Sequence, residues 1–158
     1  MEIEQIQNSV YVVRAQKVML DSDLANLYGV ETKVLNLAVK RNSNRFPEDF
    51  MFTLSENEWH DLRFHFETSS DHGGRRYLPK VFTEQGIAML SGVLKSDRAV
   101  NVNISIMRMF VQMRKLASEY SELEERVSEL EDRSTKVYLA ILELMNPAIK
   151  DMNPIGYK

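Results

Sequence analysis

The amino-acid sequence predicts an α+β fold, in which a domain with a helix-turn-helix and small β elements is followed by a long C-terminal coiled-coil helix. Short β-prone runs alternate with short helical patterns through the first two thirds of the chain. Gly29 separates two of these helical patterns, as a helix-turn-helix requires. From Met113 onward, apolar residues recur every three or four positions. We expect a domain at residues 1–112, a coiled-coil helix at 113–145 and a tail at 146–158.

The first elements are expected to form a β-hairpin. Val10–Arg14 and Lys17–Leu20 are both β-prone, and only Ala15 and Gln16 separate them. The turn lacks the Asn or Gly that usually supports a two-residue connection. The short spacing nevertheless favours antiparallel pairing of the two runs.

Two closely crossing helices are expected after the hairpin. The first begins after Asp21 or Ser22, either of which could cap it, and ends at Gly29, whose backbone can take a positive φ. The second helix runs from about Thr32 to Arg41. Ala25 lies where the two helices come closest, so a larger side chain there would push them apart. The apolar positions expected to pack the second helix against the first are Val30, Leu35 and Ala38.

A strand and a further helix follow. Asp49–Leu54 reads as a strand, and Ser55 with Glu58 matches a capping box, which predicts a helix over residues 56–66. Thr68–Gly74 is rich in glycine and small polar residues, so we expect a loop there.

The last elements before the long helix are a strand and a short helix. Arg76–Val81 is β-prone, and Pro79 favours a place at the edge of a sheet. Thr83 is expected to cap a helix that reaches about Leu94, and Ser96 to cap the long helix.

The long helix carries a heptad pattern. Its apolar positions are spaced by three and four residues in alternation, and only Ser134 among them is polar. Leucine at most d positions is compatible with a two-stranded coil. Asn146 and Pro147 are expected to end the helix. The seam positions are Met113, Leu116, Tyr120, Leu123, Val127, Leu130, Ser134, Val137, Ile141 and Leu144.

The outer face of the second short helix has the chemistry of a DNA recognition helix. Thr32 and Asn36 can form hydrogen bonds with base edges, whereas Lys33 and Lys40 can reach guanine edges or phosphates. A plain pair of antiparallel helices would leave the same apolar spacing. The absence of acidic residues between Lys33 and Arg45 favours the DNA-binding interpretation.

Charge is segregated along the chain, which has 158 residues and a formal net charge of −3. Residues 1–115 hold 15 basic and 14 acidic side chains, whereas the remainder holds 5 basic and 9 acidic ones. Such asymmetry indicates a polyanion-binding half joined to a different module, although an ordinary solvated surface can show it too. The basic residues expected to contact the DNA backbone are Arg41, Arg45, Arg75 and Arg76, the last two as a wing beside a glycine loop.

Several strings of the chain closely resemble the phage Orf-six-N domain family, a relative of the KilA-N domains of phages and large DNA viruses. The resemblance extends from about Val10 to Arg114 and includes LYGVET, KRN with RFPEDF, GGRRYLP and FTEQG. It implies DNA binding and a role on mobile elements or in their regulation. It implies no enzymatic activity and gives no residue-level DNA contacts.

Other classes of protein fit the sequence poorly. With no cysteine there is neither a disulfide nor a thiol nucleophile, and we expect a cytoplasmic protein. No apolar run is long enough to span a membrane. His60, His65 and His72 lack metal-ligand spacing, so no metal, cofactor or catalytic site is expected.

The sequence therefore predicts a DNA-binding homodimer with a regulatory role, assembled through its C-terminal helix. A protein-interaction module that uses the coiled coil is an alternative, as is a phage-encoded antagonist of a host protein. A nuclease is the least favoured reading, because no cluster of acidic residues has metal-binding geometry.

Overall fold

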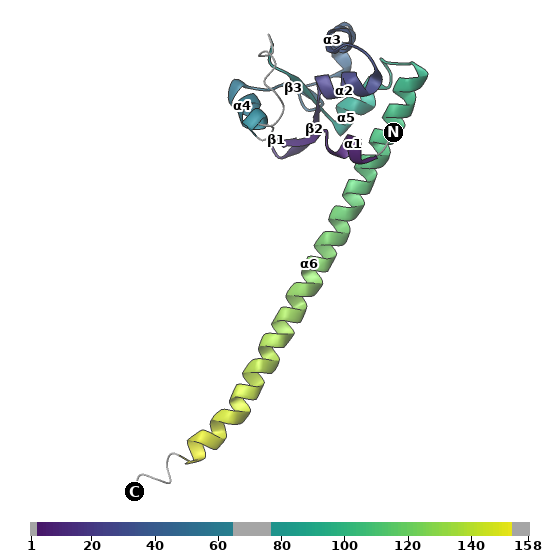
Figure 1. Cartoon of the computed structure of the whole chain (residues 1–158). Helices are drawn as coiled ribbons and strands as arrows, with labels where there is room; N and C mark the ends of the chain where they lie inside the picture. The colour runs from purple at the N-terminus through teal and green to yellow at the C-terminus, as the bar shows by residue number, and fades with distance from the viewer. Residues whose placement is uncertain (1–2, 65–76, 153–158) are drawn as a thin grey trace. The chain divides into compact units, whose positions relative to one another are not determined.

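The structure is a computed structural model that describes residues 3–64 and 77–152, with side chains described up to residue 146. The chain divides into two compact units, Met1–Gln112 and Met113–Lys158 (Figure 1). The elements, in chain order, are α1 (Ile3–Gln7), β1 (Val10–Val13), β2 (Gln16–Leu20), α2 (Asp21–Tyr28), α3 (Thr32–Arg41), the 3-10 turn η1 (Ser43–Arg45), β3 (Met51–Thr53), α4 (Glu56–Phe64), β4 (Lys80–Thr83), α5 (Glu84–Leu90) and α6 (Asp97–Met152).

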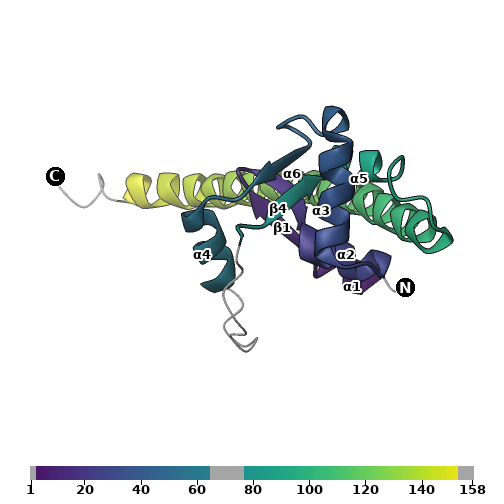
Figure 2. The ribbon, with the colours of Figure 1, turned by 90° about the horizontal axis from the view of Figure 1, so that it is seen from above.

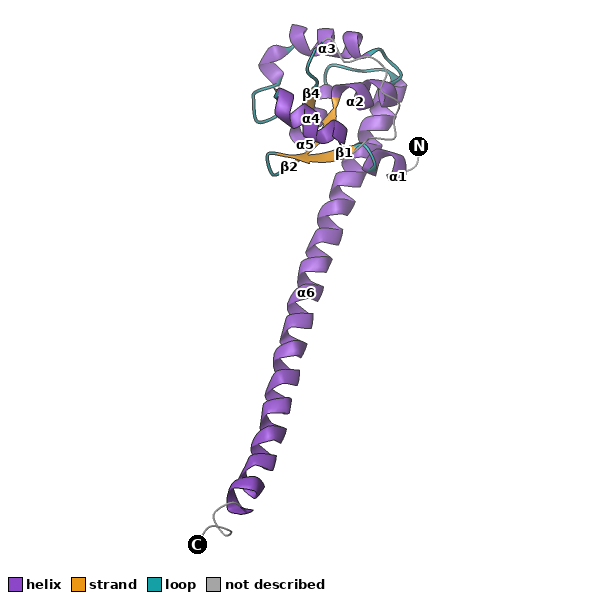
Figure 3. Ribbon diagram, turned by 60° about the vertical axis from the view of Figure 1, so that its left-hand side comes forward, coloured by secondary structure: helices purple, strands orange, loops and turns teal. Residues whose placement is uncertain are grey.

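The N-terminal unit contains a small antiparallel sheet in the order β1-β2-β4-β3. The strands are coloured orange in Figure 3, where helices account for most of the remaining chain. Residues of β1, β2 and β4, together with Leu54, form an apolar cluster, onto which the half-buried Trp59 and Leu62 of α4 pack. These observations confirm the predicted α+β class with a long C-terminal helix.

The predicted hairpin is present, but its turn lies one residue earlier than predicted, because Val13 pairs with Gln16 and leaves Arg14 and Ala15, rather than Ala15 and Gln16, as the connection. Its two connecting residues, Arg14 and Ala15, have φ angles of 52° and 60°. A type I′ two-residue turn, which matches the twist of the strands, has positive φ at both positions. The turn therefore adopts its required backbone without Asn or Gly, and accepts the strain that side chains bring to this region.

Three of the predicted helix starts are confirmed. The N–H of Ser55 donates to Glu58 Oε1, and the N–H of Glu58 donates to Ser55 Oγ, which completes the capping box. Thr83 Oγ1 accepts from the N–H of Gly86, and Ser96 Oγ accepts from the N–H of Ala99.

The predicted cap of the first short helix is wrong. Leu20, in extended backbone conformation, precedes the helix, and no side chain caps it. The reason is that β2 leads directly into α2, which places Asp21 inside the first turn. Its buried carboxylate then binds groups from other elements.

The strand predicted at Arg76–Val81, which is β4 in the structure, also differs from the prediction. The strand begins at Lys80, after Pro79, and it lies in the middle of the sheet, paired with both β2 and β3. Because Pro79 precedes the ladder, its missing N–H does not interrupt the pairing. The preceding strand is also shorter than expected, at Met51–Thr53. The predicted loop at 68–74 and the start of the predicted strand at Arg76 lie outside the described residues.

Two predicted helix ends are wrong. Helix α5 ends at Leu90 rather than near Leu94, and the hydroxyl of Ser91 donates back to the carbonyl of Ala88 at its end. Helix α6 continues through Pro147 to Met152. A proline removes one backbone hydrogen bond from a helix, and the helix here accommodates that loss within its length.

Candidate DNA interface

Helices α2 and α3 form a tight pair around a short turn. Gly29 has a φ of 71°, in the left-handed region, as predicted. The N–H of Val30 donates to the carbonyl of Ala25 at 3.0 Å, which closes the end of α2. Ala25 is 1% exposed, so it packs closely at the helix crossing. From the start of α6, Arg98 Nε donates to the carbonyl of Leu27 at 3.0 Å and holds the turn from outside.

The buried face of this helix pair differs slightly from the predicted one. Leu35 of α3 is fully buried, as expected, and Val39 is buried although the sequence pattern did not single it out. Val30 and Ala38 are only half-buried.

On α2, the hydroxyl of Tyr28 donates to Asn103 of α6, and burial raises the pKa of this phenol well above its usual value. Tyr28 therefore stays a neutral hydrogen-bond donor.

The exposed face of α3 is basic and partly apolar. Lys33, Lys40 and Arg41 are exposed, and α3 contains no acidic residue. Val34 and Leu37 are 48% and 44% exposed on the same helix. These two residues were not predicted as part of the outer face, although their place between Lys33 and Lys40 on a helix of period 3.6 indicates it. Apolar side chains of this size suit contact with thymine methyl groups.

Asn36 lies differently from the prediction, which put it on the outer face. It is half-buried, and its Nδ2 donates to Asp21 Oδ2 at 2.9 Å. The same carboxylate oxygen also accepts from the N–H of Lys80 at 3.3 Å. Asp21 is 2% exposed, and a buried carboxylate needs such donors, so the nearest amide of α3 turns toward it. Within the described residues, the buried Oδ1 of Asn36 has no hydrogen-bond partner.

A hollow of about 820 Å³, lined by both polar and apolar side chains, lies beside the start of α3. Thr32, also half-buried, contributes to it together with Lys33 and Asn36. The opposite wall comes from the sheet and from the residues just before β4. Sequence reasoning could not bring these segments together, because the sheet pairing that does so is non-local. The described lining residues are Asp21, Thr32, Lys33, Asn36, Thr53, Tyr77, Leu78 and Lys80.

The predicted backbone contacts are only partly brought together. Arg41 is exposed at the end of α3, beside Lys40. Arg45 is exposed in η1, but its guanidinium lies against Gly92, where an added Cβ would come within 2.5 Å of it. Arg45 therefore points toward the end of α5. The predicted wing residues Arg75 and Arg76 lie outside the described residues.

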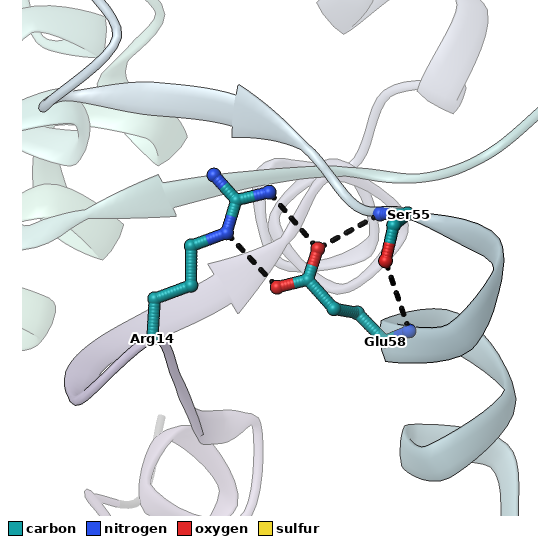
Figure 4. A network of polar contacts seen from close by, with 3 residues as sticks. All are labelled: Arg14, Ser55 and Glu58. Atoms are coloured by element: carbon teal, nitrogen blue, oxygen red, sulfur yellow. Dashed lines mark hydrogen bonds and ion pairs between the residues drawn. The ribbon is translucent and has the colours of Figure 1, made fainter.

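Helix α4 is attached at another part of the unit. In Figure 2, α3 and α4 lie apart with β4 between them. Arg14 Nε and Nη2 each lie 2.9 Å from a carboxylate oxygen of Glu58, and Figure 4 shows this paired contact beside the Ser55 cap. The guanidinium also stacks 4.2 Å from the ring centroid of Phe52. The pKa of Glu58 is lowered to about 2, first by the Arg14 hydrogen bonds and then by the N–H of Ser55.

The described residues indicate neither a metal site nor a membrane-spanning helix. Among residues 3–64 and 77–152, no group of three histidine or acidic side chains is placed to hold a metal ion. His60 is exposed, whereas His65 and His72 lie outside that part of the chain. None of the described helices combines the length and the apolar character needed to cross a bilayer.

The comparisons with known proteins bear on the same unit. The ORF6N domain model matches residues 8–93, which is more than half of the chain and includes every element from β1 to α5. This match confirms the resemblance seen in the sequence, although it stops before α6. Searches of curated proteins and of solved structures found no match. By its match to the family model, the chain belongs to the ORF6N domain family.

Proposed function

We propose that the protein binds double-stranded DNA through the exposed face of α3 and acts as a homodimer, with a regulatory role. The observation that carries the proposal is the combination of three exposed cations and no acid on α3, the second helix of a tight helix-turn-helix. In this motif the second helix enters the major groove. Membership of the ORF6N domain family is consistent with this use.

The cations are suited to phosphate contact. Lys33 lies in the first turn of α3, whereas Lys40 and Arg41 lie in the last turn. A helix of ten residues is about 15 Å long, so its two ends can reach phosphates on both sides of a major groove about 12 Å wide. Between them, Val34 and Leu37 face the solvent and can contact thymine methyl groups.

Base recognition by hydrogen bonds is expected at the start of α3. Thr32 and Asn36 border the hollow beside α3, and the Nδ2 of Asn36 already donates to Asp21. Its Oδ1 is buried, so the amide must rotate away from Asp21 before Oδ1 can accept a hydrogen bond from an exocyclic amine of adenine or cytosine. Asn36→Ala should therefore reduce discrimination between sequences and leave the salt dependence unchanged.

A salt-titrated binding measurement tests the proposal. Fluorescence anisotropy of labelled genomic and random duplexes should show affinity that falls steeply with salt. If the three exposed cations of α3 each contact phosphate, the log–log slope should be about −3 per protomer, from ~0.9 per contact.

A matched pair of lysine variants locates the contact. Lys40→Ala should flatten the slope by about 0.9, whereas Lys17→Ala, which removes an exposed lysine from β2, should leave it unchanged. A folded full-length chain that leaves both duplexes unbound at low salt contradicts the proposal.

A protein-interaction module is the second candidate, and one observation favours it. A largely apolar groove of about 380 Å³ lies between α5 and the first part of α6. Its wall includes the exposed Val100 and Ile104. If DNA binding fails while a partner protein protects this groove from chemical labelling, the second candidate is favoured.

A further inference from the structure

We infer that two copies of α6 associate as a parallel, in-register coiled coil. The inference rests on the proposed homodimer and adds the direction of the two helices. It follows from the heptad positions of residues 113–146 and from the charges beside them.

The apolar seam of this part of α6 is exposed to solvent in the single chain. Leu123, Val127 and Leu130 are 57%, 45% and 62% exposed, and the flanking seam residues Leu116 and Ile141 are 51% and 50% exposed. A continuous row of large apolar side chains at this spacing needs a partner helix to cover it. A second copy offers the same spacing, so every seam residue meets another seam residue.

The charges beside the seam distinguish the two directions. In a parallel coil, a g residue faces the e residue five positions later on the partner helix. Arg126 at g then faces the partner's Glu131 at e, an attractive pair that occurs twice. Arg133 at g faces the partner's Tyr138 at e, whose ring can form a cation–π contact with the guanidinium. One like-charged pair, Glu119 with the partner's Glu124, also occurs twice in this arrangement.

An antiparallel coil brings g residues beside g residues and e residues beside e residues. With the seam fully overlapped, Arg126 would face the partner's Arg133, and Glu124 would face the partner's Glu131. Each of these like-charged pairs would occur twice, with no attractive pair to offset them. All four side chains are exposed and thus available for such contacts. The charge pattern therefore favours the parallel direction.

The polar seam residue agrees with this direction. In a parallel, in-register coil Ser134 faces the partner's Ser134, so the two hydroxyls can form a hydrogen bond with each other. In the antiparallel overlap Ser134 would face the partner's Leu123, which offers no polar atom. A polar residue at an a position is a known means of fixing register.

The direction matters for DNA binding. The seam from Met113 to Leu144 spans about 48 Å of helix. In a parallel coil both chains enter the coil at the same end, so two ORF6N domains are tethered together for neighbouring half-sites on one duplex. An antiparallel coil would tether them at opposite ends.

Cysteine cross-linking of the full chain tests the direction. The chain has no native cysteine, so a single introduced thiol reports one position. Leu116→Cys should form a disulfide-linked dimer under mild oxidation, since both thiols lie at the same end of a parallel coil. If Leu116→Cys cross-links only when mixed with Ile141→Cys, the coil is antiparallel and the inference is wrong. Light scattering should give the mass of a dimer, and a tetramer mass would overturn the two-stranded arrangement.

A charge exchange gives an independent test. Arg126→Glu or Glu131→Arg alone should weaken the dimer by roughly three- to tenfold, because each turns two attractive pairs into repulsive ones. The double variant should restore the affinity. Residues 126 and 131 are five apart and do not face each other within one helix, so this coupling arises between helices. If the double variant shows no restoration, or if Arg126→Glu strengthens the dimer, the parallel direction is wrong.

These measurements need no DNA, so their outcome is separate from that of the proposed function. A monomeric full chain would remove the homodimer on which the inference rests. A parallel dimer that does not bind DNA would leave the inference standing and contradict the proposed DNA binding.

Discussion

Two stretches of α6 share one heptad spacing but differ completely in what covers them. When the alternating three- and four-residue spacing of the seam is continued from Met113 toward the N-terminus, it gives four residues in the N-terminal unit. All of them are at most 3% exposed, and they belong to that unit's core: Ala99, Val102, Ile106 and Met109. The same positions beyond Met113 are 45% to 78% exposed wherever a large apolar residue occupies them.

This difference shows that apolar periodicity indicates an apolar helix face but does not identify what packs against that face. The first stretch is buried within the N-terminal unit, whereas the second stays exposed among the described residues of one chain. Burial of one large apolar side chain is worth about 1.5–3 kcal/mol. The free energy available from a partner helix along the bare seam is therefore large, which is the physical basis for the proposed dimer.

The largest expected effect comes from placing charge on the bare seam. Leu123→Glu with Leu130→Glu would bury two carboxylates at d positions, so the dimer should dissociate completely at micromolar concentration. Light scattering of the full chain checks the mass. The control places the same two charges outside the seam, with Ser121→Glu and Ser128→Glu. If the seam variant keeps the parental mass, the bare stretch does not form the interface.

The covered stretch should respond in stability rather than in mass. Ile106 is fully buried, so Ile106→Ala would leave a cavity in the core and should lower the unfolding free energy of the N-terminal unit by about 2–5 kcal/mol. Urea unfolding followed by the Trp59 fluorescence measures this change. Ile104→Ala is the control, since Ile104 is 43% exposed on the same helix. Equal losses in the two variants would contradict the assignment of this face to the core.

Local chemistry explains which parts of the fold the sequence predicted well. Gly29 ends a helix because its own backbone permits a positive φ, and Ser55 caps a helix through groups three residues away. Such features depend on a few neighbouring residues, so a single sequence contains them. The heptad seam belongs to the same class, because its spacing is a property of one helix.

The parts that could not be predicted depend on partners distant in sequence. Asn36 turns inward because Asp21 is buried, and Asp21 is buried partly because Lys80 joins the sheet 59 positions along the chain. Pro79 indicated an edge strand by local rules, yet pairing on both sides makes β4 central. For the candidate site, the sequence predicted the exposed cations of α3. It did not predict the hollow beside them, because that hollow forms from segments distant in sequence.

A smaller effect is expected at the turn that Arg98 holds. Gly29→Val should lower the unfolding free energy by more than about 1 kcal/mol, because valine at positive φ is strained and its Cβ would lie 3.0 Å from the Arg98 guanidinium. Gly29→Asn separates the two causes, because asparagine tolerates the left-handed region but brings the same Cβ. Urea unfolding should give a smaller loss for Asn than for Val. Parental stability for Gly29→Val would contradict the turn geometry.

The smallest effect should come from the ion pair that attaches α4, which is a contact of the exposed surface rather than of a covered or bare helix face. The folded-state pKa of Glu58 is lowered to about 2, below the ordinary value of 4.5, so its contribution to stability is present above pH 4.5 and is lost as the pH falls toward 2. Glu58→Gln keeps an oxygen to accept from the N–H of Ser55 but removes the charge. The difference in unfolding free energy between parent and Glu58→Gln should therefore be small at neutral pH and shrink as the pH falls through that range. Glu56→Gln, on the same first turn, is the matched control. A difference that is independent of pH would mean that the Arg14 contact does not stabilise the folded chain through the charge of Glu58.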